Sequence, residues 1–426
     1  MKILRNKKEI TAFLEILKKR ASGGSQEIEQ KVKNILDDVR QNRDKAVLKY
    51  TRALDFPQAK DLKITPDEVL EYAHKADKKA VNALKLSAKR IKDFHEMQKE
   101  KSWSFSEGKT FLGQIILPLE RVGVYIPGGK ASYPSTILMN VIPAQVAGVK
   151  EIALCVPTPK GDINPYVMAV IKLLGIKEVY GIGGAQAIGA MAYGTETIKK
   201  VDKIVGPGNI YVATAKKMVF GDVDIDMIAG PSEILVIADD SANPDFIAAD
   251  LLSQAEHDEL ASAILISDSR RLSSAVNEEI ERQICNLTRQ EIARKSINNY
   301  GAIIITKDLK EAAEISNYIA PEHLEIMTKN PKKLLPLIKN AGAIFLGKWS
   351  TEALGDYSAG PNHTLPTSGT ARFSSPLGVY DFVKRSSLLS FDKNGFMKLA
   401  KTVKAIADIE GLDAHANAIV VREKHK

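Results

Sequence analysis

Apolar residues at helical spacing dominate the first hundred positions of the chain. Ile10, Phe13 and Leu17 recur at intervals of three and four residues, which places apolar side chains on one face of a helix. The segment Thr65–Glu68 combines a capping hydroxyl, a proline at the first helical position and a glutamate that can close a capping box, so a helix is predicted to start there. We therefore predict a helical N-terminal region over residues 1–105.

Beyond about Trp103 the pattern changes to short apolar runs separated by amphipathic stretches. The apolar runs are Arg121–Ile126, Glu151–Val156, Glu178–Ile182, Ile234–Ala238, Ala263–Ser267, Ala302–Thr306 and Ala343–Gly347. The amphipathic stretches include Pro165–Leu174, Pro244–Leu252 and Pro331–Asn340. Strands that alternate with helices in this way indicate βαβ units and a largely parallel sheet.

These strands are numerous enough for two α/β domains. A polar stretch at Asp239–Asn243 suggests the break between them, with a first α/β domain over 106–238 and a second over 239–376. The strand pattern then ends, and a helix over Asn394–Ile409 indicates a small helical C-terminal tail domain over 377–426. The predicted fold class is α/β, with two parallel-sheet domains between the helical N-terminal region and the tail.

The composition is that of an ordinary folded protein, since 44% of the 426 residues are hydrophobic and 26% are charged. No apolar run approaches the roughly 18 residues of a membrane-spanning helix, so we expect no membrane partner. Cys155 and Cys285 are the only cysteines, too few for a disulfide framework. The N-terminus also lacks the apolar core of a secretory signal. We therefore expect a cytoplasmic protein.

The formal charge is mildly positive, because 60 Lys and Arg residues outnumber 52 Asp and Glu residues to give +8. Many of the basic residues lie among acidic ones in the N-terminal helical stretches, and no basic block is interleaved with aromatic residues. Nucleic acid is therefore not expected as a partner. The excess suits an enzyme that handles a phosphate-bearing anion.

Four glycine-rich segments lie at strand ends: Pro127–Lys130, Gly181–Gln186, Gly206–Asn209 and Ala229–Ser232. Glycine lets the backbone approach a ligand, and a helix N-terminus behind it offers amide donors to a pyrophosphate. However, Gln186 occupies the position where a dinucleotide fingerprint has its third glycine. The loops are compatible with a dinucleotide site and also with simple strand-to-helix turns.

The seven histidines fall into two groups according to their neighbours. His74, His95 and His425 lie in charged stretches, where we expect them to be solvated. The other four histidines have polar or acidic neighbours. His257 follows Gln254 by three residues on one face of a predicted helix, and His323 follows Glu322 just inside a helix start at Pro321. His363 lies with Asp356 in a polar Gly- and Pro-rich stretch, and His415 lies near the C-terminus.

Imidazoles and carboxylates of this kind are the ligands of a catalytic zinc ion. Their spacing matches no compact zinc motif, so a structural, hydrogen-bonded role is the simpler interpretation of each histidine taken alone. The cysteines do not suggest a nucleophile. Cys155 lies inside an apolar run and Cys285 falls on the apolar face of a helix, so both are expected to be buried and inert.

Seven segments, taken together, resemble a known family. In chain order they are GGAQAIGAMAYGTE, KIVGPGNIYVATAKK, DMIAGPSEILVIAD, LLSQAEHDELASA, APEHLE, GDYSAGPNHTLPT and EGLDAHANAI. They closely resemble histidinol dehydrogenase, in order, through most of the chain after about residue 110. The resemblance implies oxidation of L-histidinol to L-histidine in two NAD-dependent steps through L-histidinaldehyde, with one zinc ion per subunit, in the last steps of histidine biosynthesis.

The resemblance also implies roles for individual residues. The zinc ligands would be Gln254, His257, Asp356 and His415, and the acid/base pair would be Glu322 and His323. The substrate would contact Ser232, Gln254, His257, His323, Asp356, His363, Glu410 and His415, and the dinucleotide would contact Tyr125, Gln186 and Asn209. The family forms homodimers in which the segment bearing His415 reaches the partner's active site. Its sheet domains are incomplete Rossmann-like units, which fits the missing third glycine.

Several alternatives use the same residues differently. The metal-type side chains would also suit a zinc-dependent dehydrogenase of a different amino alcohol, or a zinc hydrolase that uses no dinucleotide. A cysteine-dependent aldehyde dehydrogenase would need Cys155 or Cys285 as its nucleophile. A non-catalytic nucleic-acid-binding protein would instead use the positive charge.

Overall fold

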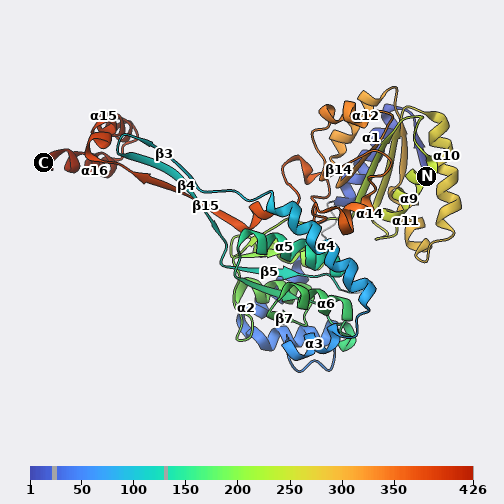
Figure 1. Cartoon of the computed structure of the whole chain (residues 1–426), viewed down its shortest axis with the longest axis horizontal. Coiled ribbons are helices and arrows are strands. Elements are labelled where there is room, and N and C mark those ends of the chain that lie inside the picture. Colours follow the sequence, from blue (N-terminus) through green and yellow to red (C-terminus); the bar gives the residue numbers. More distant parts are fainter. Residues whose placement is uncertain (22–25, 129–132, 426) are drawn as a thin grey trace. The chain divides into compact units, whose positions relative to one another are not determined.

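The computed structural model describes residues 1–21, 26–128 and 133–425. The chain forms two compact units: a large unit made of Met1–Gln98 and Leu119–Phe382, and a small unit made of Lys99–Pro118 and Val383–Lys426. Figure 1 labels their helices and strands. Across the described ranges, no helix is both long enough and apolar enough to cross a membrane.

The first sheet of the large unit has six strands in the order β2-β7-β6-β5-β8-β9. Its parallel strands are β5 (Arg121–Tyr125), β6 (Glu151–Cys155), β7 (Glu178–Tyr180), β8 (Lys203–Val205) and β9 (Asp224–Ile225), and β2 (Lys63–Ile64) is antiparallel to β7. One face is covered by α3 (Pro66–Ala73), α4 (Lys78–Glu96), α5 (Pro134–Ala147) and α6 (Pro165–Leu174), and the other by α2 (Gln26–Leu54), α7 (Gly184–Tyr193) and α8 (Ile210–Val219). Burial on both faces explains why the strand sequences are continuously apolar.

The second sheet also has six strands, in the order β1-β12-β11-β10-β13-β14. They are β1 (Lys2–Leu4), β10 (Glu233–Ala238), β11 (Ser262–Ser267), β12 (Ala302–Ile305), β13 (His323–Met327) and β14 (Ala343–Leu346), all parallel. One face packs against α9 (Pro244–Ala255), α10 (Arg270–Ile284) and α11 (Gln290–Tyr300), and the other against α1 (Lys7–Ala21), α12 (Leu309–Ile319) and α13 (Pro331–Leu334). Figure 1 shows these helices around the sheet.

The segment after β14 connects the second sheet with the first. It begins with α14 (Glu352–Leu354) and a π-helical turn over Gly355–Ala359. The Asn362 amide then donates a hydrogen bond of 2.6 Å to the carbonyl of Met139 in α5, and Phe382 is buried in the core of the first sheet. The shorter 3₁₀ turns cover Pro159–Gly161, Leu335–Leu337, Thr370–Arg372 and Val379–Phe382.

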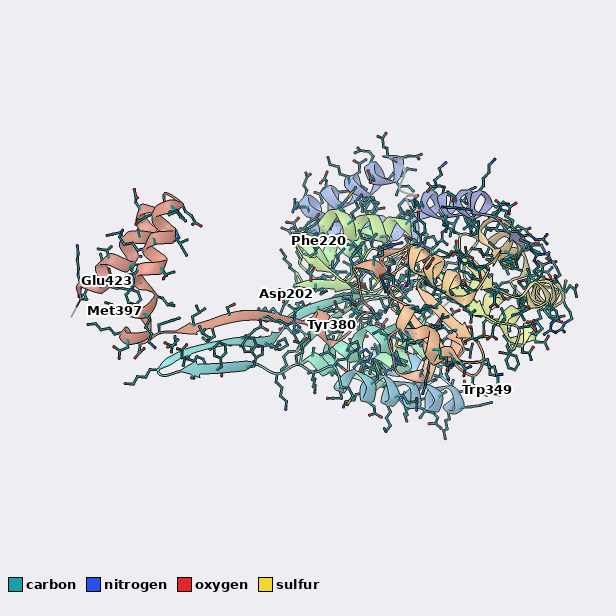
Figure 2. The ribbon with its side chains drawn as sticks, turned by 90° about the horizontal axis from the view of Figure 1, so that it is seen from above. Asp202, Phe220, Trp349, Tyr380, Met397 and Glu423 are labelled. Atoms are coloured by element: carbon teal, nitrogen blue, oxygen red, sulfur yellow. The ribbon has the colours of Figure 1, made fainter. Side chains whose placement is uncertain are left out.

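The small unit is an antiparallel three-stranded sheet with two helices. The strands β3 (Trp103–Glu107), β4 (Thr110–Pro118) and β15 (Val383–Ser390) pair in the order β15-β4-β3. Helices α15 (Lys393–Ile409) and α16 (Asp413–Lys424) pack against each other, and Figure 2 labels Met397 on the first and Glu423 on the second.

The predicted α/β class with parallel sheets is confirmed. However, the N-terminal region is not purely helical, because β1 and β2 pair with β12 and β7. These strands of three and two residues are too short to show an alternating pattern.

Two predicted boundaries also differ from the observed pairing. The boundary after residue 238 would assign β10 to the first domain, but β10 is a central strand of the second sheet. The predicted tail began at 377, whereas the small unit begins again at Val383 and includes Lys99–Pro118. Strand pairing joins these two segments, which are far apart in the chain, and the composition gives no sign of that pairing.

Two residues differ in burial from the prediction. His95 was expected to be solvated, but its side chain is fully buried, with Nδ1 donating to the carbonyl of Ile91 at 2.7 Å. Cys285 was expected to be buried, but it is exposed because α10 ends at Ile284 and the cysteine lies past the apolar face. The prediction for Cys155, buried inside β6, is confirmed.

Candidate active site

An acidic residue and a histidine lie together at the amino end of β13, beside the amino end of the adjacent strand β10. His323 is the first residue of β13, and Glu322 precedes it. The Glu322 carboxylate accepts a hydrogen bond of 2.8 Å from the backbone N–H of Glu233, and Nδ1 of His323 donates to the Glu233 carbonyl at 3.0 Å. Both side chains are buried. The first residue of β10 therefore orients the whole pair through its main chain.

The local sequence explains why Pro321 precedes a strand and not the predicted helix. Helix α12 ends before Ala320, which has a left-handed φ of 53°, and β13 is buried along its whole length between β10 and β14. A Cβ atom at Gly342 would lie 2.5 Å from the carbonyl oxygen of Glu322, so only glycine allows the two segments to approach. The prediction that Glu322 and His323 lie inside a helix start is wrong, because pairing of buried residues outweighs the proline signal.

A second cluster adjoins the pair. Ligand atoms of His257, Glu352 and Asp356 all lie within 4.8 Å of one another. Oδ1 of Asp356 is also 3.4 Å from Nε2 of His323, so the two clusters form one continuous site. One imidazole and two carboxylates form a suitable donor set for a divalent cation such as zinc.

Gln254 adds an amide to this cluster from the last turn of α9. Its side chain is buried and contacts both the Glu352 carboxylate and the backbone N–H of Glu233. With the amide nitrogen toward Glu352 it donates a hydrogen bond; with the oxygen toward Glu352 the two oxygens would repel unless a cation lay beside them. The second orientation would supply another oxygen ligand, so these residues fit a metal ion.

Gln254 and His257 were both predicted to lie in a helix, but only Gln254 does. Helix α9 ends at Ala255, and His257 lies in the following turn. Its backbone N–H nevertheless donates to the carbonyl of Gln254 at 3.2 Å, which keeps the two residues together.

Burial and charge set the proton affinities of the site. Burial raises the pKa of Glu322 to about 8, although His323 opposes the shift. Burial likewise raises the pKa of Glu352 to about 8. Burial alone would lower the pKa of His323, but the carboxylates of Glu352, Glu322 and Asp356 raise it well above 6.5. The site therefore contains groups that exchange protons near neutral pH, as general acid–base chemistry requires.

His363 and Ser232 complete the part of the predicted site that lies in the large unit. Nδ1 of His363 donates to the carbonyl of Asp356 at 3.0 Å, and burial lowers the pKa of this imidazole. Ser232 is partly exposed in the loop before β10. Ligands of open α/β sheets usually lie at the carboxyl ends of the strands, but this site lies at the amino ends of β10 and β13.

The first sheet has a cavity of about 770 Å³ at the carboxyl ends of its strands, lined by Tyr125, Gln186 and Asn209. The Tyr125 hydroxyl accepts a hydrogen bond of 3.2 Å from the N–H of Gly184, at the start of α7. Asn209 caps α8 by accepting from the N–H of Tyr211 at 3.1 Å. The three residues predicted to contact a dinucleotide thus line a single cavity large enough for a cofactor.

The side chain of Gln186, which also lines the cavity, has unsatisfied polar atoms. Gln186 is fully buried, and within the described parts of the chain neither its amide nitrogen nor its amide oxygen has a hydrogen-bond partner. Buried amides are normally paired. An amide, carboxamide or phosphate group of a ligand in the cavity would satisfy it, so the cavity fits a dinucleotide. Of the first glycine-rich segment, Gly129 and Lys130 lie outside the described residues.

Two predicted site residues belong to the small unit. Glu410 follows the last residue of α15 and His415 lies in the first turn of α16. Both side chains are exposed.

Sequence reasoning missed Glu352 and Glu233. Glu352 lies four residues before Asp356, a spacing that brings side chains together on a helix, and this spacing was the available signal. Glu233 contributes through its main chain, which no residue pattern reveals.

Comparison with known proteins gives the same family at several levels. The family model described as "Histidinol dehydrogenase" matches residues 18–423. A histidinol dehydrogenase from Aquifex aeolicus is 55% identical over 412 residues, covering 96% of each chain. One from Geobacter sulfurreducens is 56% identical over 403 residues, covering 93% of this chain and 94% of the relative.

Solved structures agree. The crystal structure of histidinol dehydrogenase from Elizabethkingia anophelis has a TM-score of 0.94 at 38% identity, covering 100% of this chain and 98% of that one. A probable aldehyde dehydrogenase from Listeria monocytogenes has a TM-score of 0.50 at 12% identity, covering 90% of this chain and 97% of that one; this likeness concerns the fold alone.

Proposed function

Because the chain belongs to the histidinol dehydrogenase family and is therefore an oxidoreductase of histidine biosynthesis, we propose that it oxidises L-histidinol to L-histidine in two NAD-dependent steps through L-histidinaldehyde, with zinc bound. The observation that carries the proposal is the convergence of Glu322, His323, His257 and Asp356 in one site, where Glu322 and His323 are buried, Asp356 is half-buried and His257 is exposed. That arrangement combines an acid/base pair with a cation-binding donor set, which the substrate's alcohol, amine and imidazole would require.

Gln254, His257 and Asp356 would hold the zinc ion, together with His415. When bound, zinc supplies a Lewis acid that can fix the substrate's ring nitrogen and amine. Ser232, His363 and Glu410 would contact the remainder of the substrate. This set of contacts would fix the alcohol carbon in one orientation. Holding a reactant in the reactive orientation accounts for much of the rate acceleration by an enzyme.

Tyr125, Gln186 and Asn209 would hold NAD in the cavity that they line, and the bound cofactor would supply the acceptor for hydride. Gln186 would pair its orphaned amide with the cofactor. The helix N-termini at Gly184 and Ile210 offer backbone amide donors of the kind that bind phosphate.

His323 is the proposed general base of both oxidations. Its Nδ1–H donates to a backbone carbonyl, so Nε2 is left to accept the alcohol proton as hydride leaves the carbon. Glu322 would accept a proton from the water that adds to the aldehyde, while His323 returns the alcohol's proton to the aldehyde oxygen. The resulting hydrate would lose its hydride in the second step while His323 takes its hydroxyl proton. The alcohol thus loses two hydride ions overall, and water provides the second oxygen of the carboxylate.

We also propose a homodimer in which each small unit completes the partner's site. Apolar side chains are exposed on this unit at Leu399, Val403, Ile406, Ile409 and Leu412. An apolar surface of this kind is typical of a subunit interface. The arrangement would give Glu410 and His415 a role despite their exposure.

Mixed dimers test the shared site. Subunits carrying His415→Asn are mixed with subunits carrying His323→Asn under conditions of subunit exchange. If sites are shared, half of the dimers are hybrids with one intact site, and activity recovers to about a quarter of wild type. If each chain completes its own site, every site carries one defect and activity stays absent.

We infer a cytoplasmic location from the cysteine chemistry. Both thiols are free, which suits a reducing compartment. Cell fractionation with an antibody to the chain tests this directly.

A coupled stoichiometry assay tests the reaction. The protein is incubated with zinc, NAD and L-histidinol, and reduced cofactor and L-histidine are followed together. Two reduced cofactors per histidine is the expected result. Reduced cofactor without histidine would favour a zinc-dependent dehydrogenase of a different amino alcohol, and turnover without any reduction would favour a hydrolase.

A further inference from the structure

A buried ion pair lies directly behind the acid/base pair. Arg20, in the last turn of α1, places Nη2 against the carboxylate of Glu233, with the two side chains only 1% and 7% exposed. Nη1 of Arg20 also donates to the carbonyl of Leu260 at 2.8 Å. The guanidinium therefore ties an N-terminal helix to the starts of β10 and β11.

Glu233 connects this ion pair to the reacting groups. Its backbone N–H donates to Glu322 and its carbonyl accepts from His323. A carbonyl can only accept, so this contact keeps a proton on Nδ1, and Nε2 is the ring nitrogen that can exchange a proton with the substrate. Displacement of the Glu233 peptide would therefore disturb both the position of the carboxylate and the tautomer of the imidazole.

The side chain of Glu233 has little freedom to find another partner. It is buried, and its other polar neighbours are the backbone N–H groups of Ser368, in the loop that follows His363, and of Glu322. Without Arg20, a buried carboxylate would lack its countercharge. Such a group must move, take up a proton or draw in water, and each response shifts the peptide to which it is attached.

We propose that Arg20 is a positioning residue for the acid/base pair and acts through Glu233. It touches neither substrate nor cofactor, and its consequence for catalysis rests on the roles proposed above for Glu322 and His323. Misplacement of catalytic groups by a remote substitution can cost about a hundredfold in rate. We expect Arg20→Gln to lower kcat by at least about tenfold, with KM for histidinol changed by less than about threefold.

Arg121 provides a matched control. It too is a largely buried arginine, with its side chain 8% exposed and paired with Glu178 and Glu151. It lies at the amino end of β5, opposite the end that carries Tyr125. Arg121→Gln should therefore reduce thermal stability, as Arg20→Gln does, but leave kcat unchanged at temperatures where the variant is folded.

Two further variants distinguish positioning from general stability. Arg20→Lys keeps a positive charge near Glu233 and should recover part of the lost kcat. The double variant Arg20→Gln/Glu233→Gln should be no slower than Arg20→Gln alone, because the second change lies on the same route. Additive losses would overturn the proposal.

Hydrogen exchange gives a readout that needs no activity. In zinc-loaded full-length protein, peptides covering residues 229–236 and 320–327 should exchange faster in Arg20→Gln than in wild type, while β6 and β7 of the first sheet should be unchanged. Unchanged protection at 229–236, or a kcat equal to that of wild type, would overturn the proposal. If wild type itself failed to oxidise histidinol, the exchange result would still decide whether Arg20 holds Glu233. Failure of the proposed reaction can therefore be distinguished from failure of the positioning role.

Discussion

Nε2 of His323 lies 3.4 Å from Oδ1 of Asp356. The opposite nitrogen of the same ring donates to a backbone carbonyl, so the imidazole stands between the sheet backbone and the candidate metal cluster. A base in this position can receive a proton from a substrate held by that cluster without moving.

His323→Asn should depress both oxidation steps. Asparagine keeps a donor near the Nδ1 position but has no group that accepts a proton as Nε2 does. Rates of cofactor reduction are measured separately with L-histidinol and with L-histidinaldehyde. A loss confined to one substrate would reassign the base of the other step.

Glu322→Gln should impair oxidation of the aldehyde much more than oxidation of the alcohol. Only the aldehyde step requires addition of water, and the amide cannot accept its proton. The loss expected for a general base is about 10²–10⁴-fold. Glu322→Gln is assayed with each substrate at matched zinc content, and equal losses in the two half-reactions would contradict this role.

Removal of zinc should weaken binding of L-histidinol, because we expect the metal to orient the substrate more than to acidify water. Protein stripped with a chelator is titrated with histidinol by calorimetry before and after zinc is restored. His257→Asn and Asp356→Asn should lower the zinc stoichiometry measured by elemental analysis. Unchanged histidinol affinity in the stripped protein would refute the orienting role.

His95 should make the fold sensitive to mild acid. Burial lowers the pKa of its imidazole below the ordinary 6.5, so the unfolded chain takes up this proton at a higher pH than the folded one. Above about pH 6.5 the residue has no effect on the pH dependence; as the pH falls below that value, the free energy of unfolding decreases.

The melting temperature from pH 8 to pH 5 provides the test. His95→Asn, which retains a donor for the carbonyl of Ile91, should show a shallower decline in acid than wild type. The exposed His74→Asn serves as control and should follow wild type. Parallel curves for all three proteins would count against the assignment.

Neither cysteine should be needed for turnover. Cys155 is fully buried, and burial raises the pKa of its thiol, whereas Cys285 is exposed just after the end of α10. A Cys155→Ala/Cys285→Ala variant should retain wild-type kcat, and a thiol reagent should label Cys285 in wild type without inactivating it. Inactivation by the reagent would revive a cysteine-dependent aldehyde dehydrogenase mechanism.

The sequence was most informative where a local pattern and the global fold agree. Thr65 forms the full capping box expected of it, and the predicted helix Pro165–Leu174 has those limits in the structure. These features depend on residues within one or two turns of each other, so short windows suffice.

Features that depend on distant contacts were not predictable. His95 is buried because a segment near Asn362 covers it, and β13 is a strand because it has β10 and β14 on either side. The gathering of Glu322, His257 and Asp356 was inferred from the family resemblance, because their separation in the chain gives no spacing rule. Glu352 escaped because its carboxylate becomes relevant only once α14 brings it against Gln254.

The pairing of β1 constrains the order in which the chain folds during its synthesis. Lys2 pairs with Ala302, so at roughly 5–20 residues per second the ribosome needs about 15–60 s to supply the partner of the first strand. The strands of the first sheet, of which the last ends at Ile225, are all synthesised during that interval. Strand β1 and the helix that carries Arg20 cannot make their final contacts until those later residues have been synthesised, so the proposed acid/base pair is held in place only after the N-terminal segment has docked on the second sheet.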